Sequence, residues 1–344
     1  MNWKLLEELC NTPGVPGHER KVAEIFKRES EGIAKKSWFD NVGNLIVHVG
    51  GEGPVVALDA HTDEVGFIVS HVDDEGFIRV VPLGGIDPRV FYAQRVVVHG
   101  SEDLQGVVGA VPPHLLNKKA DRDKAIPIED AFIDVGLPGD EVNEKVRIGD
   151  VVTFDSKFRD LGDVVIGKAF DDRLGLFVIL EAVKKAKNIA CDLYLVAAVQ
   201  EERGLRGATC AAFTVNPDIA IALEGTFAND LPGVPSHKRL ATQNEGAELR
   251  ITDRAVIADR ALVDYLAEIA EGSGIDHQFV VKNAGTTNAT AIELASGGTR
   301  VAAISAPVRY IHSPVGMVNK HDIECQIELL AKFLEVADKT PPRR

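Results

Sequence analysis

Hydrophobic and polar positions recur with helical spacing at the start of the chain. Residues 3–10 and 19–28 show that spacing, and a stretch rich in Pro and Gly at residues 11–17 separates them. Strand-like segments follow at residues 44–49 and 54–60. The second is almost continuously apolar, as expected of a strand that is covered on both faces. The first part of the chain therefore predicts two helices followed by buried strands.

The pattern changes between about residues 65 and 161. Short alternating segments at 76–81, 94–99, 106–111 and 151–154 are separated by Gly, Pro and Asp, and no long helical repeat is present. This spacing predicts a small β-barrel or sandwich of short strands.

Beyond residue 161, helical and strand-like patterns alternate to the C-terminus. Helical spacing over residues 171–187 is followed by an apolar run at 193–199, and further segments lie at 207–213, 219–223, 258–271, 301–304 and 321–336. This alternation is typical of an α/β fold. We therefore predict one α/β domain formed by residues 1–64 and 162–344, interrupted by a β-rich domain at 65–161.

Composition excludes several classes of partner. The 344 residues carry a formal net charge of -14, which argues against nucleic acid because phosphate binding needs a basic surface. The four cysteines are scattered without a CxxC pair, which favours a reducing compartment. The first residues lack the apolar stretch of a signal peptide, and no apolar run approaches the roughly 20 residues of a membrane span. We expect a cytoplasmic protein that binds neither nucleic acid nor membrane.

Charged residues follow several of the apolar runs. His61 and Asp63 come after the run at 54–60, and a spacing of two in extended backbone places them on one face. A carboxylate there can accept a proton from one imidazole nitrogen and leave the other nitrogen free for a metal. A polar pair at a strand end, with no metal, is the alternative.

The adjacent acids Glu201 and Glu202 give the sharpest local signal. They follow the apolar run at 193–199 and precede a glycine-rich segment. Two neighbouring carboxylates at the end of a buried strand repel one another and lose hydration. Bound cations relieve both costs, and one acid can bind metal while the other moves a proton. An exposed turn is the alternative.

Three further candidates carry weaker signals. Asp171 opens the predicted helix at 171–187, where an Asp also serves as an N-cap, and Glu224 ends the run at 219–223, where a cap or solvated turn is the alternative. A lone histidine such as His312 is more often structural than a ligand. Taken together, five acids and two histidines are about the inventory that peptide hydrolysis by paired metals needs. Imidazole and carboxylate suit zinc, cobalt or manganese.

The order of the motifs resembles one family. HTDEVGF at 61–67, AFDDR at 169–173, QEERGLRGA at 200–208, LEGT at 223–226 and RYIHSP at 309–314 follow one another as in the metal-dependent, tetrahedral TET-type aminopeptidases. These are the glutamyl, leucyl and lysyl aminopeptidase relatives, some of which are called endoglucanase or cellulase M. The similarity extends to PGVPGHE at 13–19, DNVGNL at 40–45 and RIGD at 147–150.

The resemblance implies a fold, an activity and roles for the candidate residues. The fold would be a zinc-exopeptidase-like α/β domain with a mixed central sheet and an inserted barrel-like oligomerisation domain. Peptides would lose their N-terminal residues, with two divalent ions per subunit (zinc or cobalt, with manganese as the alternative). Subunits would join as dimers and then as a dodecamer. One ion would be held by His61, Asp171 and Glu224, and the other by Asp171, Glu202 and His312. Glu201 would be the general base on a metal-bridging water, and Asp63 would orient His61.

The chain departs from the family pattern at two positions. Glu224 stands where many members have Asp, and Asn288 stands where members commonly have Asp, which alters a charge near the expected cleft. The alternatives to an aminopeptidase are a β-glucan endoglucanase, a catalytically silent assembly protein of the same fold, and a related metal deacylase or carboxypeptidase. Only 6% of residues are aromatic, which disfavours a sugar-binding groove.

Overall fold

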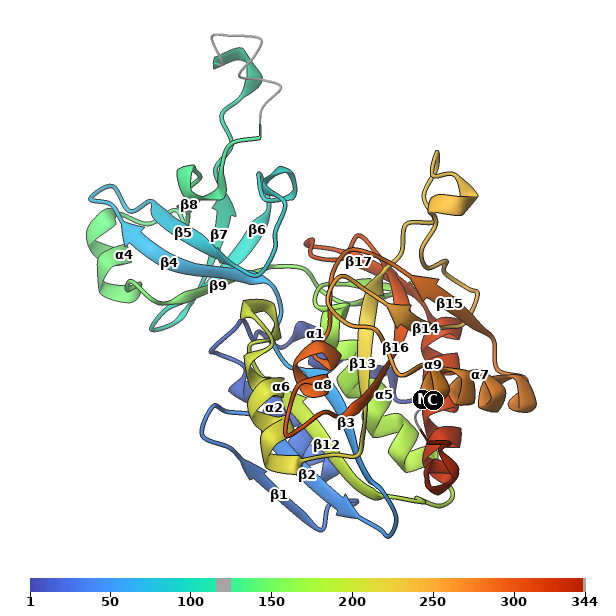
Figure 1. The fold of residues 1–344 in the computed structure, drawn as a ribbon. Coiled ribbons are helices and arrows are strands. Elements are labelled where there is room, and N and C mark those ends of the chain that lie inside the picture. The colour runs from blue at the N-terminus through green and yellow to red at the C-terminus, as the bar shows by residue number, and fades with distance from the viewer. Residues whose placement is uncertain (116–124, 343–344) are drawn as a thin grey trace.

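The computed structural model describes residues 1–115 and 125–342, and within them the chain forms two sheets (Figure 1). The larger sheet has eleven strands. Nine follow in spatial order as β1 (Lys36–Phe39), β2 (Leu45–Gly50), β12 (Asp192–Ala198), β3 (Val55–His61), β13 (Ile219–Phe227), β16 (Arg300–Arg309), β17 (Gly316–Asn319), β11 (Val164–Gly167) and β10 (Arg159–Asp160). The other two are β14 (Ala247–Thr252), which pairs with β16, and β15 (His277–Val281), which pairs with β14. The strands β12, β3, β13 and β16 are parallel, as is the pair β14–β15, and the remaining pairs are antiparallel, so the sheet is mixed.

Helices cover both faces of this sheet. One face packs against α1 (Trp3–Asn11), α2 (Arg20–Ser30), α5 (Phe170–Lys185), α7 (Arg260–Ser273) and α9 (Lys320–Glu335). The other packs against α6 (Arg206–Val215) and α8 (Ala289–Glu293). Strand residues alternate between the two cores: Val56 and Leu58 face the first, and Ala57 faces the second. Double coverage explains why these strands read as continuous apolar runs.

The smaller sheet is a closed barrel that lies beside the larger sheet (Figure 1). Its strands, in spatial order, are β4 (Gly66–Val72), β5 (Ile78–Leu83), β8 (Ile133–Asp134), β7 (Asp103–Val108), β6 (Arg95–His99) and β9 (Val151–Phe154), and α4 (Gly139–Lys145) accompanies them. Phe67, Phe91 and Phe154 pack inside it. The short 3-10 helices are η1 (Pro88–Val90), η2 (Pro113–Leu115), η3 (Ile128–Asp130), η4 (Glu201–Arg203), η5 (Ser236–Lys238) and η6 (Ala337–Lys339).

The predicted fold class, a mixed α/β sheet interrupted by an all-β barrel, is confirmed. The barrel strands lie within residues 66–154, and β10 already belongs to the larger sheet. The domain boundaries at 64/65 and 161/162 stay a prediction. Among the helices of the described residues, none is both long and apolar enough to cross a membrane.

Strand register places the candidate residues together. In the parallel pairs, His61 lies opposite Ala198 of β12, and Asp59 lies opposite Ala222 of β13. Two residues further along each strand, His61 and Glu224 reach the same edge of the sheet. Parallel strands deliver their carboxyl ends to one edge, which is where open α/β sheets bind ligands.

Candidate metal centre

Asp171 lies at the centre of the candidate site and faces both histidines. Its Oδ1 is 3.0 Å from Nε2 of His61, and its Oδ2 is 3.1 Å from Nε2 of His312. His61 ends β3, Asp171 lies in the first turn of α5, and His312 follows β16. One carboxylate therefore faces two imidazoles through its two oxygens.

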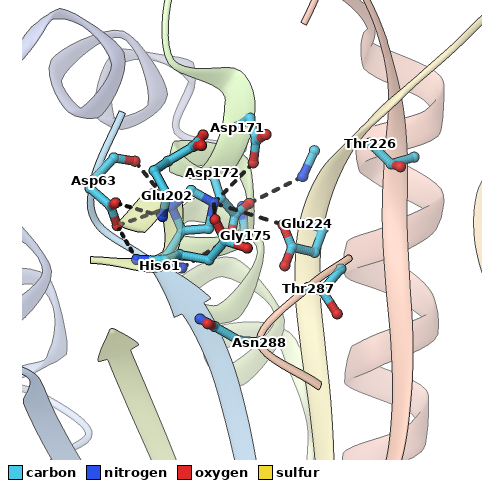
Figure 2. Close-up of polar contacts among 12 residues, drawn as sticks. His61, Asp63, Asp171, Asp172, Gly175, Glu202, Glu224, Thr226, Thr287 and Asn288 are labelled. Carbon is cyan, nitrogen blue, oxygen red and sulfur yellow. Dashed lines mark hydrogen bonds and ion pairs between the residues drawn. The ribbon is translucent and has the colours of Figure 1, made fainter. Parts of the chain in front are cut away.

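Each histidine has a further carboxylate nearby. Oε2 of Glu224 lies 3.9 Å from Nε2 of His61, and Oε1 of Glu202 lies 3.0 Å from Nε2 of His312. The donor atoms of His61, Asp171 and Glu224 all lie within 4.8 Å of one another. The same is true of Asp171, Glu202 and His312. The structure thus brings all five predicted ligands into two groups that share Asp171. Figure 2 labels His61, Asp171, Glu202 and Glu224 among them.

Asp63 is buried beneath these groups and contacts three backbone or ring nitrogens. Its Oδ1 accepts the backbone N–H of Glu201 and its Oδ2 that of Glu202, both at 3.0 Å. Nδ1 of His61 lies 3.4 Å from the Asp63 carboxylate and 3.0 Å from its backbone oxygen. Asp63 therefore holds the turn that carries both glutamates, in addition to lying beside His61 as the sequence predicts (Figure 2).

The backbone adopts left-handed conformations where the ligands leave their strands. Ala169 before α5, Gln200 before η4, and His312 itself have φ values of 58°, 56° and 56°. Non-glycine residues rarely occupy this region, and such strain is concentrated at functional sites. The sharp turns direct Asp171, Glu201 and the His312 ring toward one another.

Burial and the charges of neighbouring groups shift the pKa values of these side chains. Burial raises the pKa of Glu201 to about 8, and it also raises the pKa of Glu202 and, strongly, that of Glu224. Burial opposes ionisation of Asp171 too, but hydrogen bonds to the two histidines hold its pKa below its usual range. Against the effect of burial, Asp171 and Glu202 raise the pKa of His312 to about 11.

One buried oxygen shows that these side chains do not provide hydrogen-bond partners for all of one another's polar atoms. Oε1 of Glu202 has no hydrogen-bond partner, although His312 Nε2 is only 3.0 Å away. That nitrogen is directed at Asp171, and a single N–H cannot serve both carboxylates. A divalent cation among these atoms would give each oxygen a partner. The set of nitrogen and oxygen donors without thiolate fits zinc, cobalt or manganese.

Two contacts that orient the ligands have no signal in the sequence. Nδ1 of His312 lies 2.9 Å from the carbonyl oxygen of Gly85, in the loop after β5, so the barrel reaches the metal centre through a backbone atom. Asp172 is fully buried and accepts the backbone N–H groups of His61, Gly175 and Gly225 at 3.1, 2.9 and 3.1 Å. It ties β3, α5 and β13 together behind the ligands.

A cavity of about 580 Å³ adjoins the metal centre. Glu201 and four of the five predicted ligands line it, namely Asp171, Glu202, Glu224 and His312. The cations Arg250 and Lys282, which sequence reasoning missed, are also in its lining. Arg250 Nη2 and Lys282 Nζ donate to Oγ1 of Thr226 at 3.0 and 2.5 Å. Buried Glu248 pairs with both cations at 3.1 Å. The register that aligns Glu224 and Glu248 with Ser305 of β16 brings β14 to this cavity.

Asn288 is buried and is not among the residues that line the cavity. It is buried before α8, and its Nδ2 donates to Oδ1 of Asp59 at 2.7 Å. Thr286 and Thr287 line the cavity, and Asn288 does not. Asn288 therefore makes a buried contact with the strand that carries His61 (Figure 2).

A mixed sheet with carboxylates and imidazoles gathered at its strand ends is the architecture of a metal-dependent hydrolase. The chain belongs to the family of M42 glutamyl aminopeptidases, whose model matches residues 43–329. It is 31% identical to the lysyl aminopeptidase of Pyrococcus furiosus over 341 residues, which cover 97% of each chain. It is therefore an aminopeptidase that hydrolyses peptides from their N-terminus, as predicted from the resemblance.

Similar solved structures include two that are named aminopeptidase or peptidase and one that is named endoglucanase. A TET aminopeptidase from a marine sediment Thaumarchaeota archaeon superposes with a TM-score of 0.94 at 34% identity, covering 98% of this chain and 96% of that one. The TET1 peptidase of Pyrococcus horikoshii, which can assemble into a tetrahedron or a large octahedral shell, gives 0.86 at 32% identity, covering 96% and 98%. An endoglucanase of Thermotoga maritima gives 0.80 at 30% identity, covering 97% of each chain.

Proposed function

We propose that this chain is a dinuclear-metal aminopeptidase in which Asp171 bridges two divalent cations. His61 and Glu224 would complete one ligand set, and Glu202 and His312 the other. The observation that carries the proposal is the position of Asp171, whose two oxygens face different histidines at 3.0 and 3.1 Å. Zinc or cobalt, with manganese as the alternative, suits these donors.

Glu201 is the proposed general base. When bound, the cations would polarise the scissile carbonyl and acidify the attacking water. Glu201 lies outside both groups that share Asp171, yet its Oε2 is 4.0 Å from Nε2 of His61. Its pKa of about 8 would fall toward neutrality near positive charge, the range in which a general base works best. Glu201 removes a proton from the attacking water and then donates it to the leaving amine, while Asp63 holds its backbone in place.

The cationic wall of the cavity favours an acidic N-terminal residue in the substrate. Arg250 and Lys282 line the cavity, whereas Glu248 and Asp253, which neutralise them, lie behind. A glutamate or aspartate side chain placed against Arg250 and Lys282 would therefore meet N–H donors, away from the carboxylates that line another part of the cavity. Hydrogen bonds between charged groups in such a buried place discriminate strongly against apolar side chains.

A β-glucan endoglucanase is the second candidate, because one relative of known structure carries that name. Glycoside hydrolysis uses two carboxylates that flank the scissile bond. Here the carboxylates converge on two imidazoles instead, and one aromatic side chain, Phe227, lines the described part of the cavity. A catalytically silent assembly protein would have no use for these buried carboxylates, one oxygen of which has no hydrogen-bond partner.

A panel of aminoacyl-p-nitroanilides, assayed with zinc, cobalt and manganese, tests the proposal. We expect release from glutamyl and aspartyl substrates, and none from the same substrates with an acetylated N-terminus. Hydrolysis of the blocked substrates would indicate a deacylase or carboxypeptidase. Chelator-resistant activity on carboxymethyl-cellulose would indicate the glycosidase.

We further propose that subunits associate into dimers and then a dodecamer, with the barrel at the interface. The barrel segment exposes apolar residues, among them Ile148 (72%) and Val107 (48%), whereas Phe91 is fully buried in the barrel core. The assemblies of the Pyrococcus horikoshii peptidase support this proposal. Light scattering should give a mass near twelve times 37.1 kDa, and a monomer mass at every concentration would refute it. A cytoplasmic location stays a prediction.

A further inference from the structure

Asp276, His321 and Cys325 form another group of potential metal ligands, and it shares no residue with the metal centre. Asp276 directly precedes β15, whereas His321 and Cys325 lie four residues apart in α9. That spacing places both side chains on one face of the helix. The three donor atoms all lie within 4.8 Å of one another.

The distances among these atoms suit a tetrahedral cation. Nε2 of His321 is 2.9 Å from Oδ2 of Asp276 and 3.6 Å from Sγ of Cys325. Zinc bonds to nitrogen, oxygen and sulfur of about 2.0–2.3 Å place tetrahedral ligand atoms about 3.3–3.6 Å apart. A cation therefore fits once the contact between His321 and Asp276 opens by a few tenths of an ångström.

The same geometry disfavours a nucleophilic relay. In a relay of thiol, imidazole and carboxylate, the nucleophile and the acid contact opposite ring nitrogens. Here Asp276 and Cys325 both lie closest to Nε2 of His321, and Nδ1 is farther from the sulfur, at 3.9 Å. The donors converge on one point, as metal ligands do.

The surroundings hold the three donors in place. Asn319 caps α9 by accepting the backbone N–H of His321 at 2.9 Å, and the carbonyl of Asp276 accepts the N–H of Ala247 at 3.0 Å. The His321 and Asp276 side chains are 39% and 68% exposed, whereas Cys325 is buried. The sulfur thus lies at the bottom of the group, and solvent reaches the other two ligands.

We propose that the Asp276–His321–Cys325 site binds one zinc or cobalt ion, with water as the fourth ligand. A thiolate ligand selects these ions over magnesium, calcium and manganese. Binding releases the thiol proton to solvent, because the thiolate is the ligand. The ion would link α9 to the turn before β15, and α9 shares its core with α5, which carries Asp171.

Titration of metal-free protein with cobalt(II) tests the site through absorption from thiolate-to-cobalt charge transfer. The metal centre offers only nitrogen and oxygen donors, so this absorption reports on a cysteine ligand alone. At saturating cobalt we expect a band whose intensity corresponds to one thiolate-bound ion per chain. The band should be lost in Cys325→Ser and weakened in His321→Gln and Asp276→Asn. The measurement needs no substrate, so its result does not depend on whether the proposed activity is correct.

A matched control is Cys210→Ser, which removes the half-exposed free thiol on α6 and should leave the band unchanged. Total cobalt binding should fall by one equivalent in Cys325→Ser and not in Cys210→Ser. Absence of the band in the unmodified chain, or its persistence in Cys325→Ser, would overturn the proposal. If Cys325→Ser does not fold, His321→Gln replaces it, since that side chain is partly exposed, and an unchanged band in this variant would equally overturn the proposal.

Discussion

The cavity beside the candidate metal centre has two charged walls that are built in opposite ways. The acid wall, which comprises Asp171, Glu201, Glu202 and Glu224, carries carboxylates that share too few proton donors, and Oε1 of Glu202 is left without a partner. The cation wall, which comprises Arg250 and Lys282, is already neutralised by buried acids and bonded to Thr226. The acid wall therefore has carboxylate oxygens that a cation could bind, whereas the charges of the cation wall are already balanced by the protein.

Under the proposed function, the acid wall carries out the chemistry and the cation wall recognises the substrate. Side chains of the acid wall are fixed by strand ends, strained turns and the buried carboxylates of Asp63 and Asp172. Changes there should remove activity. Changes in the cation wall should redirect activity between substrates, because its charges are balanced without the metal centre.

Removal of metal should have the largest effect. Chelation followed by dialysis should lower turnover at least about 10³-fold, since a Lewis-acid metal contributes several kcal/mol to catalysis. Cobalt or zinc should restore activity, measured on glutamyl-p-nitroanilide. The variant Cys325→Ser should respond in the same way, which separates the metal centre from the Asp276–His321–Cys325 site. Full activity after complete chelation would contradict the function of the acid wall.

The adjacent acids should differ when each is changed alone. Glu201→Gln should lower kcat at least about 10²-fold, as loss of a general base does, while two metals stay bound. Glu202→Gln is the matched control and should lose metal instead, because it removes a ligand. Metal content by mass spectrometry and kcat are measured on both variants. Equal loss of metal in the two would abolish the proposed division of roles.

A change in the cation wall should alter the preference between glutamyl and leucyl substrates. Lys282→Met keeps the length of the side chain and removes its charge, so kcat/KM for glutamyl substrates should fall about 10- to 100-fold, the worth of one hydrogen bond between charged groups. Leucyl substrates should be cleaved as well as before or better. Lys4→Met, at an exposed position of α1, is the control and should change neither value. A parallel loss for both substrates would show that Lys282 supports the fold rather than recognition.

The smallest effect should appear in the pH dependence of that selectivity. Burial lowers the pKa of Lys282 to about 8, although Glu248 opposes the shift. The ammonium group is therefore charged below pH 8 and neutral above it, so the preference for glutamyl over leucyl substrates should decline as the pH rises through about 8. The ratio of the two kcat/KM values measures this directly. A profile that is the same in Lys282→Met would assign the decline to another group.

The two walls also differ in how far the sequence predicts them. The strands and helices that carry the acid wall have strong sequence patterns: residues 54–60 and 171–187 are expected where β3 (Val55–His61) and α5 (Phe170–Lys185) lie. Their apolar runs are long because both faces of the sheet are covered. A charged residue directly after such a run indicates the edge of the sheet, so the candidate residues could be predicted from the sequence.

The cation wall could not be predicted in this way. In β14, Glu248 and Arg250 occupy alternate positions, a pattern that normally indicates a solvent-facing side. Both are nevertheless buried, because they pair with each other and Glu248 also pairs with Lys282 of a distant segment. Similarly, the contact of Gly85 with His312 uses a backbone oxygen, which leaves no mark in the residue type. Such features depend on tertiary pairing, and the sequence pattern carries only local information.

The dinuclear centre is tested most directly by an anomalous diffraction map of crystals grown with zinc or cobalt, recorded at the absorption edge of the metal. We expect two peaks at the acid wall, each about 2.0–2.3 Å from its ligands, with Asp171 contacting both. His61 and Glu224 should border one peak, and Glu202 and His312 the other. A single peak in active protein, or two peaks that do not share Asp171, would contradict the dinuclear centre.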